Sequence, residues 1–553
     1  MNRLIVLSLS ILYFTLSSHT QLKDSTISSV APRDVQVAEK LIGLEFSDAK
    51  RDSMLEELQD QLKEYETLRN VQLPNSIAPA LMFNPIPQGF KFERKRKPFA
   101  ISSPGNVKVP KNIEELAFYS VGELAYLMKN RKITSTQLTA MYLDRLKKYG
   151  PTLECVITLT ESLALARAQR ADAEIAMGKY RGPLHGIPYG AKDLLATKGI
   201  KTTWGSVPFK DQVFDDDATV IKRLEKAGAV LVAKLSLGEL AWGDVWFGGM
   251  TRNPWNLKQG SSGSSAGSAA TTAAGLVAFS IGSETWGSIV SPSTRCGDTG
   301  LRPTYGRVSR NGAMALSWSM DKLGPICRTV EDCAIVFNTI YGPDGIDQSV
   351  YDAPFNYNSK VNLHSLKIGY LKAEFDSAQA NKTNNDSTLA VFRHLGVHLI
   401  PIELPKYPIG SLSVILSAEA GAAFDELTRS GKDDLLVRQI KNAWPNTFRA
   451  SRFILAVEYI QANRVRTLVI EEMAKLMDTI DVYLAPPFSG DNLLLTNLTG
   501  HPCVVLPNGF NDEGSPTSVT FIGRLFDEAT LLAVAKAYQD ATDFHRKHPM
   551  LPQ

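Results

Sequence analysis

Residues 260–307 read GSSGSSAGSAATTAAGLVAFSIGSETWGSIVSPSTRCGDTGLRPTYGR and contain two turns that carry serine. Residues 260–268 are all Gly, Ser or Ala, and such small side chains let backbone amides approach a ligand closely. An Ala-rich apolar run over 269–279 separates this loop from a second turn at 285–288, TWGS. Two serine-bearing turns joined by a buried element can bring two hydroxyls together. That arrangement suits nucleophilic catalysis if a base lies elsewhere in the chain.

Lys192 is the candidate base. It follows a short apolar run, 187–191, in the sequence GIPYGAKDL of residues 186–194, which predicts a strand with the lysine at its end. A lysine accepts a proton only when it is neutral. Its reference pKa of about 10.4 would have to fall by about three units, at a cost on the order of 4 kcal/mol. Burial in apolar surroundings can lower the pKa by that amount.

A set of motifs in one order resembles the amidase signature family. The motifs are GIP…KD at 186–193, NPWN at 253–256, the Gly/Ser loop, GSETWGSI at 282–289 and GLRPTYGRVSR at 300–310. Any one of them alone is a weak signal, but their joint occurrence in this order is a strong one. The resemblance runs from about Ile113 to the C-terminus. It implies an α/β fold with a large mixed β-sheet covered by helices on both faces, and the alternation of strand-like and helix-like segments favours the same class.

The resemblance also implies a catalytic triad. In the family the lysine of the first motif is the base, a serine of the Gly/Ser loop held by a cis peptide relays the proton, and the serine of the G-S-I turn is the nucleophile. On this chain these positions are Lys192, Ser264 and Ser288. The oxyanion is expected to be held by backbone N–H groups of Thr285, Trp286, Gly287 and Ser288.

The turn departs from the family pattern at two positions. The usual sequence is DTGGSIR, whereas residues 284–290 read ETWGSIV. Trp286 replaces a glycine, so the backbone there cannot require a conformation open only to glycine. Val290 replaces an arginine that meets an anionic substrate in some members. We expect Trp286 and Val290 to contact the substrate and to favour neutral amides.

Other chemistries fit the sequence less well. Residues 263–267 match the G-x-S-x-G elbow of α/β hydrolases, but the preceding NLKQ of 256–259 does not read as a buried strand. The Gly-rich loop lacks the G-K-[S/T] ending that binds nucleotide phosphates. The eight histidines show no metal-ligand spacing. No cofactor is therefore expected, either metal or organic.

Composition and the N-terminus narrow the class of protein. The formal net charge of +3 over 553 residues is too small to indicate binding of nucleic acid or anionic lipid. Arg3 followed by the apolar run 4–16 predicts a secretory signal peptide over residues 1–20, hence a periplasmic or secreted protein. That run is shorter than the roughly 18 apolar residues of a spanning helix, so no stable membrane span is expected. Residues 21–112 are predicted to form two helices and an extended connector, and 113–553 the catalytic domain.

The sequence therefore predicts an exported amidase. It would hydrolyse a small-molecule carboxylic amide to carboxylate and ammonia or amine through a seryl acyl-enzyme. Two alternatives stay open: a protein of the amidotransferase A-subunit type, and a catalytically silent binding protein in which Trp286 blocks the oxyanion site. The signal peptide and Val290 speak against the first. The oligomeric state is left open by the sequence.

Overall fold

The computed structural model describes residues 30–377 and 381–552, and the chain divides into two compact units between Pro74 and Asn75. The predicted signal peptide lies outside the described residues. The predicted boundary at residue 113 separates the N-terminal region from the catalytic domain, whereas the structure groups residues 75–112 with the large unit. The two N-terminal helices and most of the connector thus belong to different units.

The small unit contains the two predicted helices, α1 (Pro32–Ile42) and α2 (Asp48–Arg69). A buried ion pair joins them, because the Arg51 guanidinium donates two hydrogen bonds of 2.8 Å to the Glu39 carboxylate. Two parallel N–H···O bonds fix the relative orientation of the two side chains, and hence of the helices that carry them.

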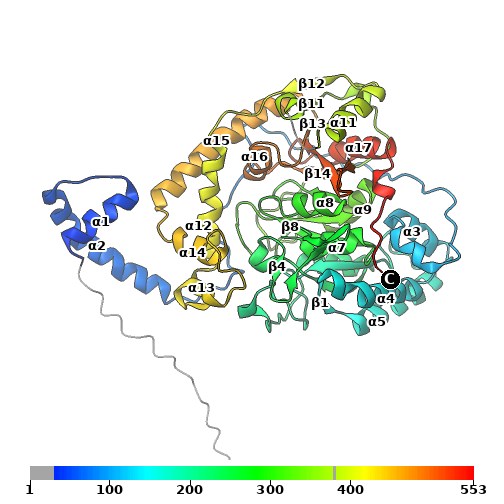
Figure 1. The fold of residues 1–553 in the computed structure, drawn as a ribbon, viewed down its shortest axis with the longest axis horizontal. Coiled ribbons are helices and arrows are strands. Elements are labelled where there is room, and N and C mark those ends of the chain that lie inside the picture. Colours follow the sequence, from blue (N-terminus) through cyan, green and yellow to red (C-terminus); the bar gives the residue numbers. More distant parts are fainter. Residues whose placement is uncertain (1–29, 378–380, 553) are drawn as a thin grey trace, which may run out of the picture. The chain divides into compact units, whose positions relative to one another are not determined.

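The large unit is built on an 11-stranded mixed sheet (Figure 1). In spatial order its strands are β1 (Val156–Leu159), β3 (Val230–Leu235), β2 (Pro188–Lys192), β8 (Phe279–Glu284), β10 (Lys322–Cys327), β9 (Thr299–Arg302), β14 (Cys503–Phe510), β15 (Pro516–Gly523), β13 (Val482–Ala485), β11 (Ile368–Leu371) and β12 (Leu399–Ile402). β2 pairs in parallel with β3 and β8, and β11 with β12 and β13, whereas the remaining pairs are antiparallel. The predicted α/β class with a large mixed sheet is confirmed.

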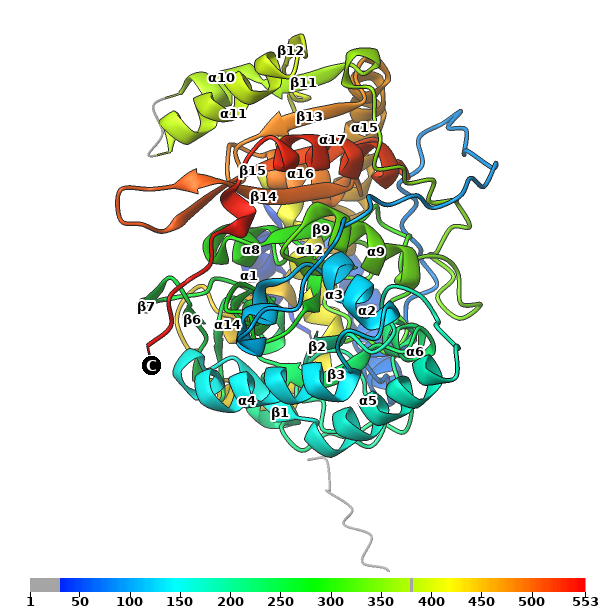
Figure 2. The ribbon, with the colours of Figure 1, turned by 90° about the vertical axis from the view of Figure 1, so that its right-hand side faces the viewer.

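Helices surround the sheet along its whole length. They are α3 (Val121–Lys129), α4 (Ser135–Leu153), α5 (Glu161–Ala176), α6 (Thr219–Lys226), α7 (Ala266–Ala273), α8 (Val290–Cys296), α9 (Val330–Ile340), α10 (Lys372–Asp376), α11 (Lys382–His394), α12 (Val414–Ala423), α13 (Asp425–Arg429), α14 (Trp444–Ser451), α15 (Ala456–Thr479), α16 (Asn492–Leu498) and α17 (Glu528–Asp540). Figure 2 shows α4 and α5 at the end of the sheet that holds β1, and α10 and α11 at the opposite end beside β11 and β12. No helix within residues 30–377 and 381–552 is long and apolar enough to cross a membrane.

Successive residues of strand β3, which lies next to the edge strand β1, belong to different parts of the core. Leu231 packs in the larger apolar cluster, whereas Val230 and Val232 pack in a second cluster together with Ala269 and Ala270 of α7. Because successive side chains of a strand point to opposite faces, both faces of the sheet are covered here. The first part of the Ala-rich run of the sequence therefore belongs to the helix α7, which packs against β2, β3 and β8.

Two local sequence patterns can be compared directly with the structure. Ser120 followed three residues later by Glu123 predicts a capping box, which is present at the start of α3, since Ser120 and Glu123 each accept from the other's backbone N–H. Gly150 predicts the end of the helix that begins at Ser135, and this prediction is wrong, because α4 continues through Pro151 to Leu153. Leu153 is fully buried, so core packing favours this additional turn over the local glycine signal.

Candidate active site

Lys192 is the last residue of the buried strand β2, and its side chain has no exposed surface. Its Nζ lies 2.9 Å from Ser264 Oγ and 2.8 Å from Ser283 Oγ, with Ser265 Oγ at 3.1 Å. Burial lowers the pKa of Lys192 to about 7, although Asp321 and Glu284 oppose this shift at longer range. The amine is thus surrounded by hydroxyls and can exist in its neutral form near neutral pH.

The carboxylate of Asp193, which follows Lys192 in sequence, is bonded to groups other than Lys192. Asp193 pairs at 2.7 Å with Lys234 of the neighbouring strand β3, and both side chains are fully buried. It also accepts from the backbone N–H of Thr203 at 2.7 Å and from its hydroxyl at 2.6 Å. A carboxylate bound to Lys192 would hold the lysine in its charged form. By pairing with Asp193, Lys234 therefore helps Lys192 to exist in its neutral form, which is the form that can accept a proton.

The Gly/Ser loop brings Ser264 to the lysine. The Gly263–Ser264 peptide bond is cis. A Cβ atom at position 263 would stand 1.7 Å from the carbonyl oxygen of Gly243, so this position has room only for glycine. The Gly238 N–H donates to the Ser264 carbonyl at 3.2 Å, which holds the loop from its other side. Small residues are thus required here by close backbone packing.

Ser288 lies in the turn between β8 and α8 and is 9% exposed. The Ser265 N–H donates to the Ser288 carbonyl at 3.2 Å and so ties the two serine turns together. Among the described residues, the Ser264 and Ser288 hydroxyls form no direct hydrogen bond with each other. Catalytic hydrogen bonds often close only when substrate binds. The structure therefore joins Lys192 to Ser264 directly and places Ser288 in a turn that is bonded to the neighbouring Ser265.

The turn predicted to hold the oxyanion has one residue in the left-handed conformation. The left-handed conformation falls on Gly287, with φ of 86°, and Trp286 does not share it. The Trp286 side chain is 45% exposed. Within the described chain, no hydrogen bond uses the N–H groups of residues 285–288 as donors. These donors remain available for a developing negative charge.

The Glu284 side chain holds this turn in place through hydrogen bonds. Its Oε2 accepts the N–H groups of Ile289 at 2.8 Å and Val290 at 2.9 Å. Its Oε1 accepts from Arg302 at 2.7 Å and from Asn497 at 2.9 Å. Burial alone would raise the pKa of Glu284, but Arg302 and the donated N–H bonds hold that pKa down to about 2. A fixed carboxylate thus occupies the two N–H groups that follow Ser288 and leaves those of residues 285–288 free.

Val290 lies away from solvent. It is fully buried and packs with Cys503 and Val505 of β14. Its predicted contact with substrate stays a prediction, and in this structure the side chain contributes to the core beneath the turn. Ser283 and Glu284, which bond to the lysine and to the turn, were not singled out by the sequence. Their position in the quoted GSETWGSI motif was the signal that could have found them.

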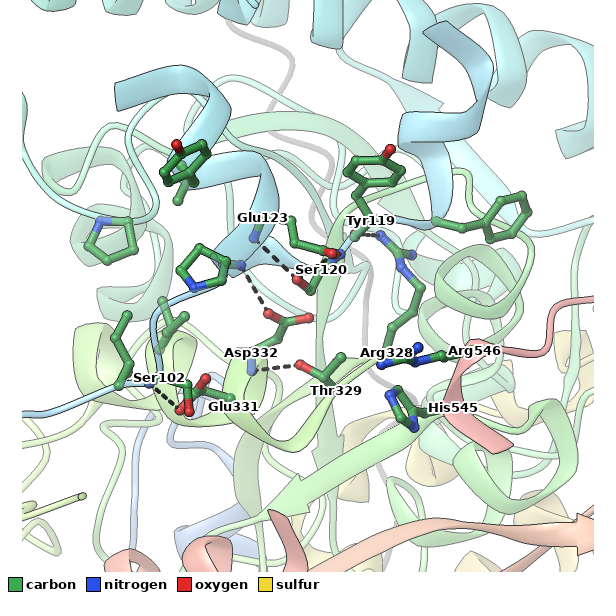
Figure 3. Close-up of a pocket in the computed structure, with 18 of the residues that line it drawn as sticks. Ser102, Tyr119, Ser120, Glu123, Arg328, Thr329, Glu331, Asp332, His545 and Arg546 are labelled. Carbon is green, nitrogen blue, oxygen red and sulfur yellow. Dashed lines mark hydrogen bonds between the residues drawn. The ribbon is translucent and has the colours of Figure 1, made fainter. Parts of the chain in front are cut away.

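Two cavities are relevant to the assignment. One of about 590 Å³ is lined by Ser283 and Thr285 and so adjoins the triad. A larger one of about 1140 Å³ lies between α3, α9 and the C-terminal segment, where Asp332, Arg328 and His545 face it (Figure 3). None of the predicted site residues lines the larger cavity. No group of three or more His, Cys, Asp or Glu suited to a metal ion occurs in the described part of the chain.

Comparison with known proteins gives one consistent family. The family model described as Amidase matches residues 137–493. The A subunit of the glutamyl-tRNA(Gln) amidotransferase of Carboxydothermus hydrogenoformans is 34% identical over 487 residues, covering 79% of this chain and 100% of the relative. The protein of the same name from a Roseiflexus species is 36% identical, covering 76% of this chain and 96% of the relative.

Solved structures agree with this result. The peptide amidase from Stenotrophomonas maltophilia superposes with a TM-score of 0.70 at 28% identity, covering 80% of this chain and all of that one. The A subunit of the glutamyl-tRNA(Gln) amidotransferase from Thermotoga maritima gives 0.66 at 27% identity, covering 79% of this chain and 97% of that one.

Proposed function

The chain belongs to the amidase signature family, and we propose that it is a hydrolase that cleaves small carboxylic amides through an acyl-enzyme on Ser288. The observation that carries the proposal is the buried Lys192 amine, 2.9 Å from Ser264 Oγ and bonded to hydroxyls. A lysine in a neutral, desolvated site next to a serine is the arrangement that makes a weak oxygen nucleophile reactive.

The reaction can be written with these groups. Ser288 Oγ attacks the amide carbon, its proton passes to Ser264 Oγ, and the Ser264 proton passes to the neutral Nζ of Lys192. The N–H groups of residues 285–288 hold the oxyanion. The proton returns through Ser264 to the leaving nitrogen, the C–N bond breaks, and Ser288 is left as an ester. Water then attacks the ester by the same proton path and releases the carboxylate.

The pH dependence follows from the lysine. Its pKa is lowered to about 7, so the active neutral form grows as pH rises through that value. We expect kcat/KM for a neutral amide to increase with pH with a midpoint near 7 and then level off. Lys192→Arg should remove this rise together with the activity, because arginine keeps its proton up to pH of about 12 or more. A wild-type profile that is flat between about pH 5 and about pH 9 would exclude Lys192 as the base.

The charges beside the site predict substrate selectivity. Asp321 and Arg310 line the smaller cavity, but the Arg310 guanidinium already bonds to Asp347 and to the Trp318 carbonyl. A substrate carboxylate in this cavity would meet no free cation among these groups. It would also lie near the acidic side chains of Asp321 and Asp347, which both line the cavity. We expect kcat/KM for a neutral amide to exceed that for a carboxylate-bearing analogue of similar size by more than about tenfold. Equal or faster turnover of the anion would contradict this.

A role as the A-type subunit of an amidotransferase is the second candidate. The relatives that are 33–36% identical carry that name, which favours it. Such a protein would release ammonia to an acceptor held by a partner. The discriminating experiment measures ammonia from a neutral amide with the purified chain alone. Stoichiometric ammonia and acid support the hydrolase, whereas cleavage only in the presence of a partner and an acceptor supports the amidotransferase.

Export is part of the proposal. The charged start and apolar run of residues 1–16 support it. Intact-mass analysis of the exported fraction should give a chain shortened by roughly 20 residues. Recovery of full-length soluble protein from the cytoplasm alone would contradict export.

A further inference from the structure

We propose that residues 75–82 form the outer wall of the substrate site and select amides that carry an extended apolar group. The inference rests on the proposed amidase function and adds to it a substrate class and a segment that determines specificity. The segment precedes residues 137–493, where the family model matches. It therefore lies outside the region that the family model matches.

The segment lines the same cavity as two residues that lie next to the proposed triad. Residues 75–82 line the cavity of about 590 Å³ whose other lining includes Ser283 and Thr285. Ser283 Oγ lies 2.8 Å from the catalytic amine, and Thr285 begins the oxyanion turn. Cavities of about 300–1,000 Å³ are typical of sites for small organic ligands. In the proposal, a substrate bound at Ser288 extends into a chamber that the segment lines.

The segment is fixed at both ends. The Asn75 side chain donates to the Ala315 carbonyl at 2.8 Å and accepts from the Ala315 N–H at 2.7 Å. At the other end, the Phe83 ring packs against Tyr305 with centroids 5.1 Å apart, and its centroid lies 3.5 Å from the Arg466 guanidinium. These anchors hold a defined stretch of chain against the cavity.

Between the anchors the segment presents apolar side chains that lack protein cover. Ile77 is 56%, Leu81 78% and Met82 60% exposed, although all three line the cavity. Apolar side chains at the edge of a hollow gain most from a ligand that covers them. The exposed surface of these three side chains is therefore suited to contact with a hydrocarbon group of the substrate.

Other lining residues have matching chemistry. Leu194, Met314, Leu316 and Leu323 are buried and line the same cavity. The charged side chains in the lining are already bonded to protein groups: Asp321 accepts from Thr285 and from the N–H groups of Leu316 and Ser317. The chamber thus offers apolar surface and no free cation among the groups described here. A neutral amide with an aliphatic or aromatic group fits these surroundings.

The test measures chain-length selectivity in two series of neutral primary and N-alkyl amides, one extended on the acyl side and one on the amine side. In the wild type, kcat/KM should rise by about fourfold for each added methylene in one series until the chamber is full. Ala78→Trp, which places a ring in the cavity lining, should lower kcat/KM for long amides by at least about tenfold and leave acetamide nearly unchanged. Asn75→Ala, which removes the anchor, should flatten the length dependence. Gln88→Trp, in an exposed part of the connector outside the lining, is the matched control. It should change neither kcat/KM for long amides nor the dependence on chain length.

A second measurement separates this inference from the proposed function. Alkyl fluorophosphonates of increasing chain length react with an activated serine without any amide being cleaved. Length-dependent labelling of Ser288 that Ala78→Trp removes would support the wall even if no amide were hydrolysed. Amide hydrolysis with equal loss for short and long substrates in Ala78→Trp, or with an unchanged length profile in Asn75→Ala, would overturn the wall and leave the amidase function standing.

Discussion

Replacing Ser288 by alanine is expected to abolish acylation and to lower kcat by on the order of 10⁵- to 10⁶-fold. The physical reason is that no other hydroxyl beside the free N–H groups of residues 285–288 is placed to form the acyl ester. Ser264→Ala should cause a large loss as well, because the proton path from Ser288 to Lys192 passes through its hydroxyl. The measurement is kcat for a neutral amide together with the rate of fluorophosphonate labelling.

Ser265→Ala is the matched control for these variants. Ser265 Oγ also lies near the lysine, at 3.1 Å, but it donates to the Ser283 carbonyl at 3.0 Å and accepts from the Ser283 N–H at 3.2 Å. We therefore expect it to support β8 and its replacement to leave substantial activity. If Ser265→Ala abolished labelling while Ser288→Ala kept it, the G-x-S-x-G elbow would be the correct interpretation of the loop.

Replacing Arg302 by methionine is expected to destabilise the fold by about 3–5 kcal/mol, because it leaves a buried carboxylate without its counter-charge. Arg302 and Glu284 are both fully buried and 2.7 Å apart. Glu284 also holds the N–H groups of Ile289 and Val290, so the nucleophile turn should lose its order together with stability. The measurement is the free energy of unfolding by denaturant, with activity measured in parallel.

The stability of Arg302→Met should depend on pH in the opposite direction to the contribution of the native ion pair. In the native protein the pKa of Glu284 is lowered from 4.5 to about 2, so the pair contributes stability above pH 4.5 and loses it as pH falls to about 2. Without Arg302 the carboxyl is buried and unpaired, so its pKa should rise above 4.5 and its penalty should shrink as pH falls. Arg295→Met, which replaces an exposed arginine of α8, should lower the free energy of unfolding only slightly at any pH. A similar small cost for Arg302→Met would mean that the pair does not support the turn.

The sequence predicted the α/β class and the strand that carries Lys192 because both depend on local patterns. Short apolar segments alternate with helical segments, and Lys192 directly follows one of them. The capping box of Ser120 and Glu123 was predictable for the same reason, since its two residues are only three positions apart. Close backbone packing at Gly263 is likewise consistent with a loop of small residues.

Contacts between distant parts of the chain could not be predicted in this way. Val290 packs with Cys503 and Val505, which lie on a strand far along the sequence. Asp193 pairs with Lys234 of the neighbouring strand, 41 positions away in the chain. The grouping of residues 75–112 with the large unit depends on anchors such as Asn75 to Ala315, which no local pattern reveals.

The central claim is that Lys192 activates Ser288 through Ser264. The most direct measurement is the mapping of a fluorophosphonate adduct by peptide mass spectrometry in the wild type and in Lys192→Met. The account predicts one adduct on Ser288 in the wild type, formed faster as pH rises through about 7, and almost no adduct in Lys192→Met at any pH. An adduct on Ser265, or an adduct on Ser288 that forms equally fast without the lysine, would contradict it.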